Sequence, residues 1–377
     1  METKAIKLDA ANIDAAAIKE AAEAIDAGAL VAFPTETVYG IGCRADSDSL
    51  AKLDQLKGRP ADKYYTLHIA KPSDCLRYVP AMGLRAKKLV KNAWPGPLTI
   101  VFGLDESDIE RQKANLPPEV FSNLYRDGSI GIRCPDNPIA TMLLSATSSS
   151  VVAPSANISG QAPAVEAGQV IEQFGGWLEM VLDGGPCKYG KSSTVVRVGK
   201  TGAPGGLEVL RQGVYADAQV LEMAKVTILF VCTGNSCRSP IAEGLYRKYL
   251  AEKFDCTVDR LEERGYKVIS AGTLGMVGYP ASAEAVRVCA AKSVDISAHR
   301  SRALSRYLIE KSDIIFALAR IHKNAVTDIS PEAAQRCVLL AEDTDIHDPI
   351  GQSQSVYDDC AELIDRAVKK RIGELVL

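Results

Sequence analysis

Residues 226–240 read Val-Thr-Ile-Leu-Phe-Val-Cys-Thr-Gly-Asn-Ser-Cys-Arg-Ser-Pro, and a helix-like run, Ile-Ala-Glu-Gly-Leu-Tyr, follows at 241–246. The apolar start predicts a buried strand, so the residues from Cys232 onward form a loop between a strand and a helix. Such a loop directs backbone N–H groups to one point, where the helix dipole also favours an anion. Arg238 adds a planar guanidinium that suits phosphate oxygens, and Cys232 lies at the base of the loop. The stretch therefore predicts a phosphate site with a thiol nucleophile, whose pKa the same positive field is expected to lower.

The rest of the C-terminal part alternates regularly between strand and helix patterns. Strands are predicted at 226–231, 267–270 and 314–318 and near 338–341, and helices over 240–254, 281–291 and about 355–375. This alternation predicts a doubly wound parallel sheet, with ligands bound at the carboxyl ends of its strands. Cys232 falls at such an end.

The N-terminal part has a different pattern, typical of a mixed α/β domain with a large twisted sheet. An alanine-rich helix is predicted from Ala10 to Ala27, ended by Gly28, and a strand follows at 29–33. Further strands are predicted at 65–69, 98–102, 129–133, 151–153, 180–182, 193–197 and 207–211, with helices at 50–56, 84–93 and 138–145. The change of pattern predicts two domains, residues 1–218 and 225–377.

Composition narrows the class of protein. The 377 residues carry a formal net charge of −3, so no overall basic field favours a nucleic acid or a membrane as partner. Ten cysteines are scattered without a Cys-x-x-Cys pair, and the four histidines do not cluster with them, which favours reduced thiols and no metal site. No apolar leader or membrane-length segment is visible, so we expect a cytoplasmic protein that does not bind a membrane.

Phosphoryl transfer to a thiolate also needs an acid for the leaving group. The best candidate is Asp348 in the segment Asp343-Thr-Asp-Ile-His-Asp-Pro-Ile-Gly351, although an Asp-Pro pair is equally typical of a plain turn. Ser239 is expected at the helix start, as an N-cap-like residue whose hydroxyl also stabilises the thiolate. Cys237 is either a filler of the loop or a resolving thiol that pairs with Cys232 under oxidation.

The region from about Lys225 to the end resembles the low-molecular-weight protein-tyrosine phosphatases. The motifs that carry the resemblance are 231–240, Ser270-Ala-Gly-Thr273, Asp295-Ile-Ser-Ala-His-Arg-Ser-Arg302 and Asp348-Pro349. The resemblance implies that Cys232 is the nucleophile, Arg238 the phosphate clamp and Asp348 the general acid, with Asn235 and Ser239 organising the loop.

The substrate of this phosphatase is expected to be a phosphorylated protein. Thr233 stands where tyrosine phosphatases of this family usually carry a larger aliphatic residue, and it resembles the family's protein-arginine phosphatase branch. The segment Ile350-Gly-Gln352 replaces the aromatic pair common in tyrosine-specific members. Phosphoarginine is therefore favoured, with phosphotyrosine as the alternative.

Three motifs of the N-terminal part are each weak evidence of function when taken alone. They are Pro34-Thr-Glu-Thr-Val-Tyr-Gly40, Lys57-Gly-Arg-Pro60 with Lys63, and Pro154-Ser-Ala-Asn-Ile-Ser-Gly160. The first is compatible with a plain turn, the second with a solvated basic face or an anion clamp, and the third with a phosphate-binding nest.

In this order, and with the segments 94–99, 132–138, 192–194 and 211–213, the motifs resemble the YrdC-like threonylcarbamoyl-AMP synthases over about residues 10–215. The resemblance implies a twisted sheet with a concave, positively charged cavity. There ATP, L-threonine and bicarbonate form threonylcarbamoyl-AMP, which supplies the threonylcarbamoyl group of modified tRNA adenosine, with tRNA and tRNA-modification proteins as partners. The ATP ligands implied are Lys57, Arg59, Lys63, Ser155, Asn157 and Arg211, and the threonine ligands are Thr35, His68, Arg133 and Ser193. Mg²⁺ is expected to bridge phosphate oxygens.

Other functions remain open at this stage. The N-terminal domain could be a tRNA- or double-stranded-RNA-binding module that has lost synthesis, joined to a tyrosine phosphatase. It could also be a carbamoyl-phosphate-using relative from hydrogenase maturation, although no acylphosphatase-like or zinc-finger segment is visible. His68 could equally be a strand histidine packed against the sheet. The main expectation is a bifunctional synthase and cysteine-dependent phosphatase.

Overall fold

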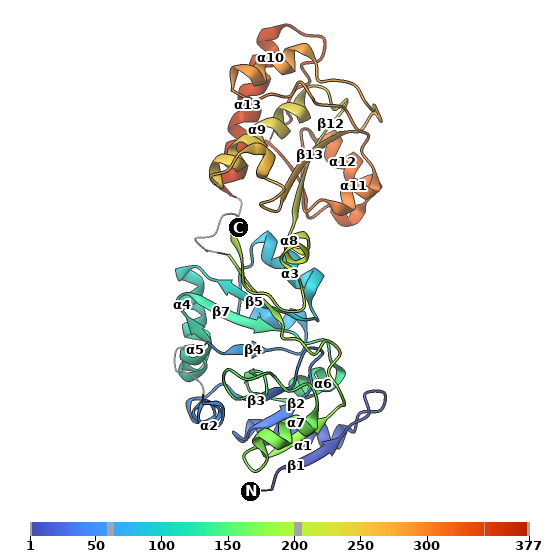
Figure 1. Cartoon of the computed structure of the whole chain (residues 1–377). Coiled ribbons are helices and arrows are strands. Elements are labelled where there is room, and N and C mark those ends of the chain that lie inside the picture. The colour runs from blue at the N-terminus through green and yellow to red at the C-terminus, as the bar shows by residue number, and fades with distance from the viewer. Residues whose placement is uncertain (1, 59–63, 200–205, 343, 375–377) are drawn as a thin grey trace. The chain divides into compact units, whose positions relative to one another are not determined.

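A computed structural model describes residues 2–58, 64–199, 206–342 and 344–374 (Figure 1). The chain forms two compact units that divide between Ala224 and Lys225. The helix α8 (Asp217–Met223), which a boundary at 218 would cut, packs against α3 (Leu84–Ala93) in the first unit.

The first unit is built on a mixed sheet to which the described residues contribute eleven strands, in the order β1-β9-β2-β3-β8-β4-β7-β5-β10-β11, with β6 paired to β7. The bounds are β1 (Lys4–Lys7), β2 (Val31–Phe33), β3 (Gly40–Arg44), β4 (Thr66–His68), β5 (Leu98–Gly103), β6 (Tyr125–Arg126), β7 (Ser129–Arg133), β8 (Val151–Val152), β9 (Met180–Asp183), β10 (Thr194–Val198) and β11 (Leu207–Arg211).

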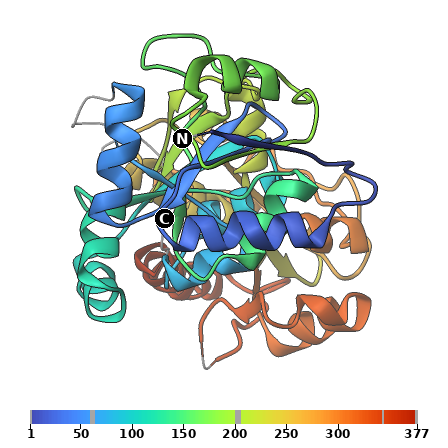
Figure 2. The same cartoon turned by 90° about the horizontal axis from the view of Figure 1, so that it is seen from below.

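Helices cover both faces of this sheet. Successive side chains of a strand point to opposite faces, and here both faces are apolar, so each face needs helices to bury it. Val31 and Phe33 of β2 pack with α1 (Ala15–Asp26) and α6 (Pro138–Ala146), whereas Ala32 between them packs with α7 (Ala167–Phe174). Figure 2 shows α1 and α7 on opposite sides of these strands. The remaining helices are α2 (Ser47–Lys57), the 3₁₀ helix η1 (Pro72–Arg77), α4 (Glu106–Asn115) and α5 (Pro118–Leu124).

Several elements differ from the sequence-based prediction: the strands β1, β3 and β6 were not predicted, and the first helix has another start. The first helix begins at Ala15 and not at Ala10, because the Asp14 side chain caps it by accepting from the N–H groups of Ala16 and Ala17. The strand β3 was not predicted, since its Gly-Ile-Gly start is weak in strand propensity. It pairs antiparallel to β2, where a Cβ at Gly42 would lie 2.7 Å from the Phe33 ring, so only glycine fits.

The second unit has four parallel strands among its described residues, in the order β13-β12-β14-β15. They are β12 (Val226–Cys232), β13 (Tyr266–Gly272), β14 (Ile314–Ala317) and β15 (Cys337–Leu339). Helices flank both faces: α9 (Arg238–Lys253), α10 (Ala283–Ala291) and α13 (Gln354–Gly373) pack together, and α11 (Arg306–Lys311) and α12 (Arg320–Ile329) lie on the other side (Figure 1). The described residues of this unit also include two 3₁₀ helices, η3 (Val258–Arg260) and η4 (Pro331–Ala333). The predicted doubly wound sheet is confirmed.

Among the described residues no helix combines the length and the apolar character needed to cross a membrane. All ten cysteines are free thiols.

Candidate functional site

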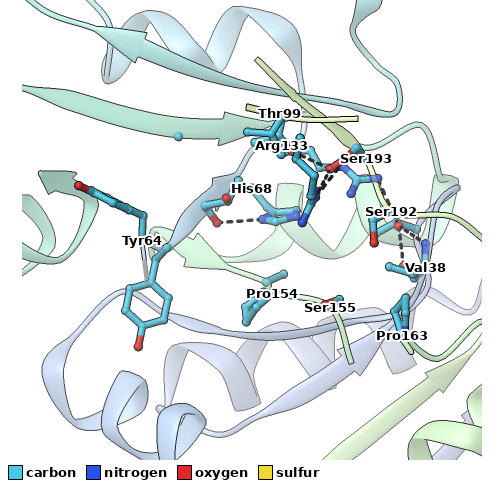
Figure 3. Close-up of a pocket in the computed structure, with 18 of the residues that line it drawn as sticks. Val38, Tyr64, His68, Thr99, Arg133, Pro154, Ser155, Pro163, Ser192 and Ser193 are labelled. Atoms are coloured by element: carbon cyan, nitrogen blue, oxygen red, sulfur yellow. Dashed lines mark hydrogen bonds between the residues drawn. The ribbon is translucent and has the colours of Figure 1, made fainter. Parts of the chain in front are cut away.

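The first unit contains a cavity of about 760 Å³ whose wall is one row of side chains across neighbouring strands. His68 at the end of β4 is in register with Arg133 at the end of β7, and Arg133 is in register with Thr99 of β5. Residues paired in register point to the same face of a sheet. Ser193, immediately before β10, extends the row, and its Oγ lies 2.9 Å from Oγ1 of Thr99 (Figure 3). Thr35 also lines the cavity, so the four predicted threonine ligands are brought together.

A buried carboxylate holds Arg133 in place. Nη2 of Arg133 donates to Glu36 Oε1 at 3.0 Å and to the Thr37 hydroxyl at 2.6 Å, and both charged side chains are almost fully buried. The other carboxylate oxygen of Glu36 accepts from the Asp136 N–H at 3.0 Å. A planar guanidinium held at one edge keeps a fixed orientation toward the cavity. Glu36 received no role from the sequence, although it stands inside the Pro34–Gly40 motif.

His68 is a neutral histidine in this cavity. Burial and the neighbouring Arg133 charge lower the pKa of His68 from 6.5 to about 3. Its Nδ1 lies 3.0 Å from the Thr66 carbonyl oxygen, which can only accept, so Nδ1 carries the proton. The second nitrogen, Nε2, is therefore an acceptor, which suits an ammonium or hydroxyl donor of a small ligand.

The loop after β8 forms the opposite wall, and Figure 3 shows Pro154 and Ser155 across the cavity from Arg133 and Ser193. Ser155 donates to Asn157 Oδ1 at 2.6 Å, and Asn157 Nδ2 donates to the carbonyl of Gln161 at 2.9 Å. Both predicted ATP ligands line the cavity. Their amide and hydroxyl groups also give the loop its shape.

Lys57 differs from the exposed phosphate clamp that we expected. Its side chain is buried, and Nζ donates to the backbone carbonyls of Ser155 and Asn157, the latter at 2.5 Å. The carbonyl of Lys57 in turn accepts from the Ser159 N–H. In this structure Lys57 fixes the loop that lines the cavity, and its contact with ATP stays a prediction. Arg59 and Lys63 lie outside the described residues.

Arg211 at the end of β11 closes a third side of the cavity. Its Nη2 donates to the Ser193 carbonyl at 3.0 Å. Burial and the Arg133 charge both lower the pKa of Arg211, because two guanidinium groups share this small space. Gly213 makes the approach possible: a Cβ there would lie 2.3 Å from the Ser192 carbonyl oxygen.

The charged residues that line the cavity, among those described, are arginines, and two of them are paired from outside the lining: Arg133 with Glu36 and Arg197 with Glu208. Arg133, Arg197 and Arg211 line it, and none of the described lining residues is Asp or Glu. Positive groups with apolar walls attract anions. The described residues also contain no cluster of three or more His, Cys, Asp or Glu side chains that could hold a metal.

The second unit carries its site at the carboxyl end of β12. Cys232 ends this strand, its Sγ lies 2.9 Å from the Ser239 Oγ, and the Asn235 N–H donates to Sγ at 3.2 Å. Asn235 has a φ of 55°, in the left-handed region, which turns its N–H toward the sulfur. Its side chain donates to the hydroxyls of Ser239 and Ser270, both at 2.8 Å. The loop thus encircles the thiol.

Two expectations for this loop are wrong. The Cys232 pKa is raised, because burial outweighs the lowering by Ser239, Arg238 and the Asn235 N–H. The sequence showed the positive groups but not the depth of burial. Ser239 is not the N-cap of α9, since the helix begins at Arg238 after Cys237, and Ser239 lies in its first turn.

Arg238 links three parts of the site. Its Nη2 donates to the Thr233 hydroxyl at 3.0 Å and to the Asp348 carboxylate, and its Nη1 donates to the Ile346 carbonyl at 3.0 Å. Asp348, 110 residues away in sequence, is therefore brought to the phosphate loop as predicted. Its carboxyl group is partly exposed, which suits proton exchange with a ligand.

Cys237 is a free thiol and forms no disulfide with Cys232 in this structure. Its Sγ lies 3.2 Å from the Tyr357 hydroxyl and 3.5 Å from the Ser282 hydroxyl. Its resolving role stays a prediction.

One residue at this site was missed altogether. His322 of α12 is buried, and its Nε2 lies 2.9 Å from the Thr233 Oγ1. No motif marks it, because 89 residues separate the two side chains.

These two sites define an α/β protein with an arginine-lined cavity and, in a separate unit, a loop centred on a buried cysteine. The Sua5/YciO/YrdC family, described as telomere recombination, matches residues 23–213, and the low molecular weight phosphotyrosine protein phosphatase family matches residues 227–376. The chain belongs to the first family and carries a domain of the second fused to it.

Several known proteins are similar to one part of the chain or the other. The threonylcarbamoyl-AMP synthase of Pyrococcus abyssi is 37% identical over 180 residues, which are 48% of this chain and 50% of that protein. The chain thus spans about half the length of the curated synthases it matches. The low molecular weight protein-tyrosine-phosphatase Etp of Escherichia coli K12 is 37% identical over 144 residues, 37% of this chain and 88% of that protein. A solved phosphatase of the same kind from T. tengcongensis is 32% identical and covers 40% of this chain and 100% of its own, with a TM-score of 0.36.

Proposed function

We propose that the first unit synthesises threonylcarbamoyl-AMP from L-threonine, bicarbonate and ATP. The observation that carries this proposal is the cavity wall, where Arg133 and Arg211 face a space without carboxylates among the described lining residues. The reaction gathers a triphosphate, a carboxylate and a carbamate in one place, and their negative charges repel unless cations are fixed beside them. The name of the matching relatives agrees with this activity.

The residue types fit the steps. The threonine amine attacks bicarbonate, giving a carbamate and water, and a carbamate oxygen then attacks the α-phosphorus of ATP and displaces pyrophosphate. Arg133 holds the threonine carboxylate, and neutral His68 accepts a hydrogen bond at Nε2. Ser155 and Asn157 face the nucleotide, and Mg²⁺ would neutralise the phosphates. The product would supply the proteins that modify tRNA adenosine.

The test is pyrophosphate release from ATP by the full chain. Release should require both threonine and bicarbonate, and Arg133→Met should abolish it. Arg111→Met, on exposed α4 outside the cavity, is the matched control and should leave it unchanged. Release that needs neither co-substrate refutes the proposal. No release from a folded chain that binds RNA refutes it in favour of a binding module.

We also propose that the second unit is a cysteine-dependent protein phosphatase that prefers phosphoarginine. The observation that carries it is the Arg238 guanidinium, which touches both Thr233 and Asp348 above the Cys232 loop. The Cys232 thiol gives its proton to a phosphoryl oxygen of the substrate and its sulfur attacks phosphorus. The P–N bond breaks, Asp348 gives its proton to the departing guanidine nitrogen, and the phosphoryl proton returns to sulfur in the second step. Water then attacks phosphorus, the P–S bond breaks, and Asp348 takes the water's proton as phosphate leaves.

A side-by-side assay of phosphoarginine and phosphotyrosine peptides tests the preference. The kcat/KM should be higher for phosphoarginine. Asp348→Asn should slow poor leaving groups more than activated aryl phosphates, whereas the exposed control Asp358→Asn should not. A clear preference for phosphotyrosine refutes the arginine assignment and leaves a tyrosine phosphatase.

A further inference from the structure

The hydroxyl of Thr233 is shared by two partners. Arg238 Nη2 donates to Oγ1 at 3.0 Å, and His322 Nε2 lies 2.9 Å from the same oxygen. A hydroxyl has one proton and two lone pairs. Because Arg238 occupies one lone pair, the direction of the bond to His322 decides what the hydroxyl offers to a substrate.

There are two possibilities. If Nε2 accepts the threonine proton, one lone pair of Oγ1 stays open, and the substrate meets an acceptor. If Nε2 carries a proton and donates it, both lone pairs are used, and the substrate meets a donor. A phosphoguanidinium brings N–H groups and needs an acceptor, whereas the ester oxygen of an aryl phosphate has no N–H to give.

The charge distribution favours the first arrangement. Nδ1 of His322 is buried and has no hydrogen-bond partner among the described residues, so either tautomer leaves this nitrogen unpaired and the contacts at Nε2 decide between them. On the Nε2 side Arg238 donates to Thr233 as a cation, which makes the hydroxyl a stronger donor and disfavours a second N–H aimed at the same oxygen. The ring is neutral, because burial and the Arg238 charge lower the pKa of His322 to about 4.

The backbone keeps His322 in this position. Its N–H donates to the Ala319 carbonyl at 3.0 Å, at the start of α12, and the preceding Leu318 N–H donates to the Val231 carbonyl at 3.0 Å. The helix start is thus tied to the strand that carries Cys232. The imidazole is buried, and no substrate contact is needed for it to act.

We propose that His322 is a positioning residue for the phosphatase: its Nε2 accepts the proton of Thr233 and so leaves an acceptor that selects a phosphoguanidinium over an aryl phosphate. This inference rests on the proposed phosphatase function. It adds a specificity determinant to the site and a physical reason why a threonine at position 233 favours a guanidinium.

The first test is a substrate ratio in the full chain. His322→Leu should lower kcat/KM for a phosphoarginine peptide about tenfold, the usual weight of one hydrogen bond, and change that for p-nitrophenyl phosphate little. His322→Gln, whose amide oxygen can accept near the Nε2 position, should recover most of the loss. In a Thr233→Val background His322→Leu should have no further effect, since the group it acts through is gone.

The second test is spectroscopic. The ¹⁵N chemical shifts of the His322 ring in the folded protein should show the proton on Nδ1. A proton on Nε2, an equal loss for both substrates, or a full additional loss in the Thr233→Val background overturns the proposal. If His322→Leu does not fold, the proposal is decided by the substrate ratio of His322→Gln and by the ¹⁵N shifts of the His322 ring. A wild-type preference for phosphotyrosine overturns both the arginine assignment and the selectivity proposed for His322. The Nδ1 proton and the coupling then show only whether His322 positions Thr233.

Discussion

The buried neutral histidine of the first unit makes its stability depend on pH. His68 has a pKa of about 3 in the folded chain, against 6.5 for the free side chain. The unfolded chain therefore binds a proton between these values that the folded chain does not. Stability is complete above pH 6.5 and falls as the pH drops toward 3. From pH 8 to pH 5 the loss should be about 2 kcal/mol.

Tryptophan fluorescence isolates this unit, because both tryptophans of the chain, Trp94 and Trp177, lie in it. We expect the urea-unfolding free energy to fall by that amount between pH 8 and pH 5. Carboxylates with lowered pKa values, such as Asp26 and Asp46, lose their contribution only when the pH approaches 3.8, the pKa of a free aspartate side chain. They add little in this window.

The matched control is His68→Asn, whose amide can donate to the Thr66 carbonyl in place of Nδ1–H but does not titrate. This variant should show almost no change between pH 8 and pH 5. If the wild type is equally stable at both pH values, or if His68→Asn loses as much as the wild type, the reasoning about the buried histidine is wrong.

Three further outcomes are expected. Lys57→Ala should abolish threonine-dependent pyrophosphate release by freeing the 155–157 loop and should leave p-nitrophenyl phosphate hydrolysis intact; loss of both activities in a folded variant contradicts separate units. Thr233→Ile should shift the kcat/KM ratio toward phosphotyrosine by about 10- to 100-fold, measured with paired peptides, because the added carbons crowd a guanidinium; an unchanged ratio contradicts it. In iodoacetamide mapping by mass spectrometry at pH 7, the partly exposed Cys256 should react before Cys232, because the Cys232 thiol is buried and its pKa is raised. Labelling of Cys232 first would show that its thiolate is stable despite burial. Cys232→Ser should still end phosphatase turnover.

The sequence alone was sufficient for features that depend on neighbouring residues. The strand, loop and helix around Cys232 follow each other directly in the chain, so apolar runs and turn residues predict them without tertiary information. The alternation after Lys225 likewise indicated the parallel sheet. The family motifs predicted that Thr35, Arg133 and Ser193 belong to one threonine-binding site, and in the structure all three line one cavity.

Tertiary packing decided what depends on burial and on distant partners. The Glu36 to Arg133 pair joins residues 97 apart, and the contact from Thr233 to His322 joins residues 89 apart. The side chain of Lys57 turned inward to backbone carbonyls, and the pKa of Cys232 rose where a positive loop alone had predicted a fall. Desolvation depends on every atom that packs around a group, and no local pattern of residues encodes that sum.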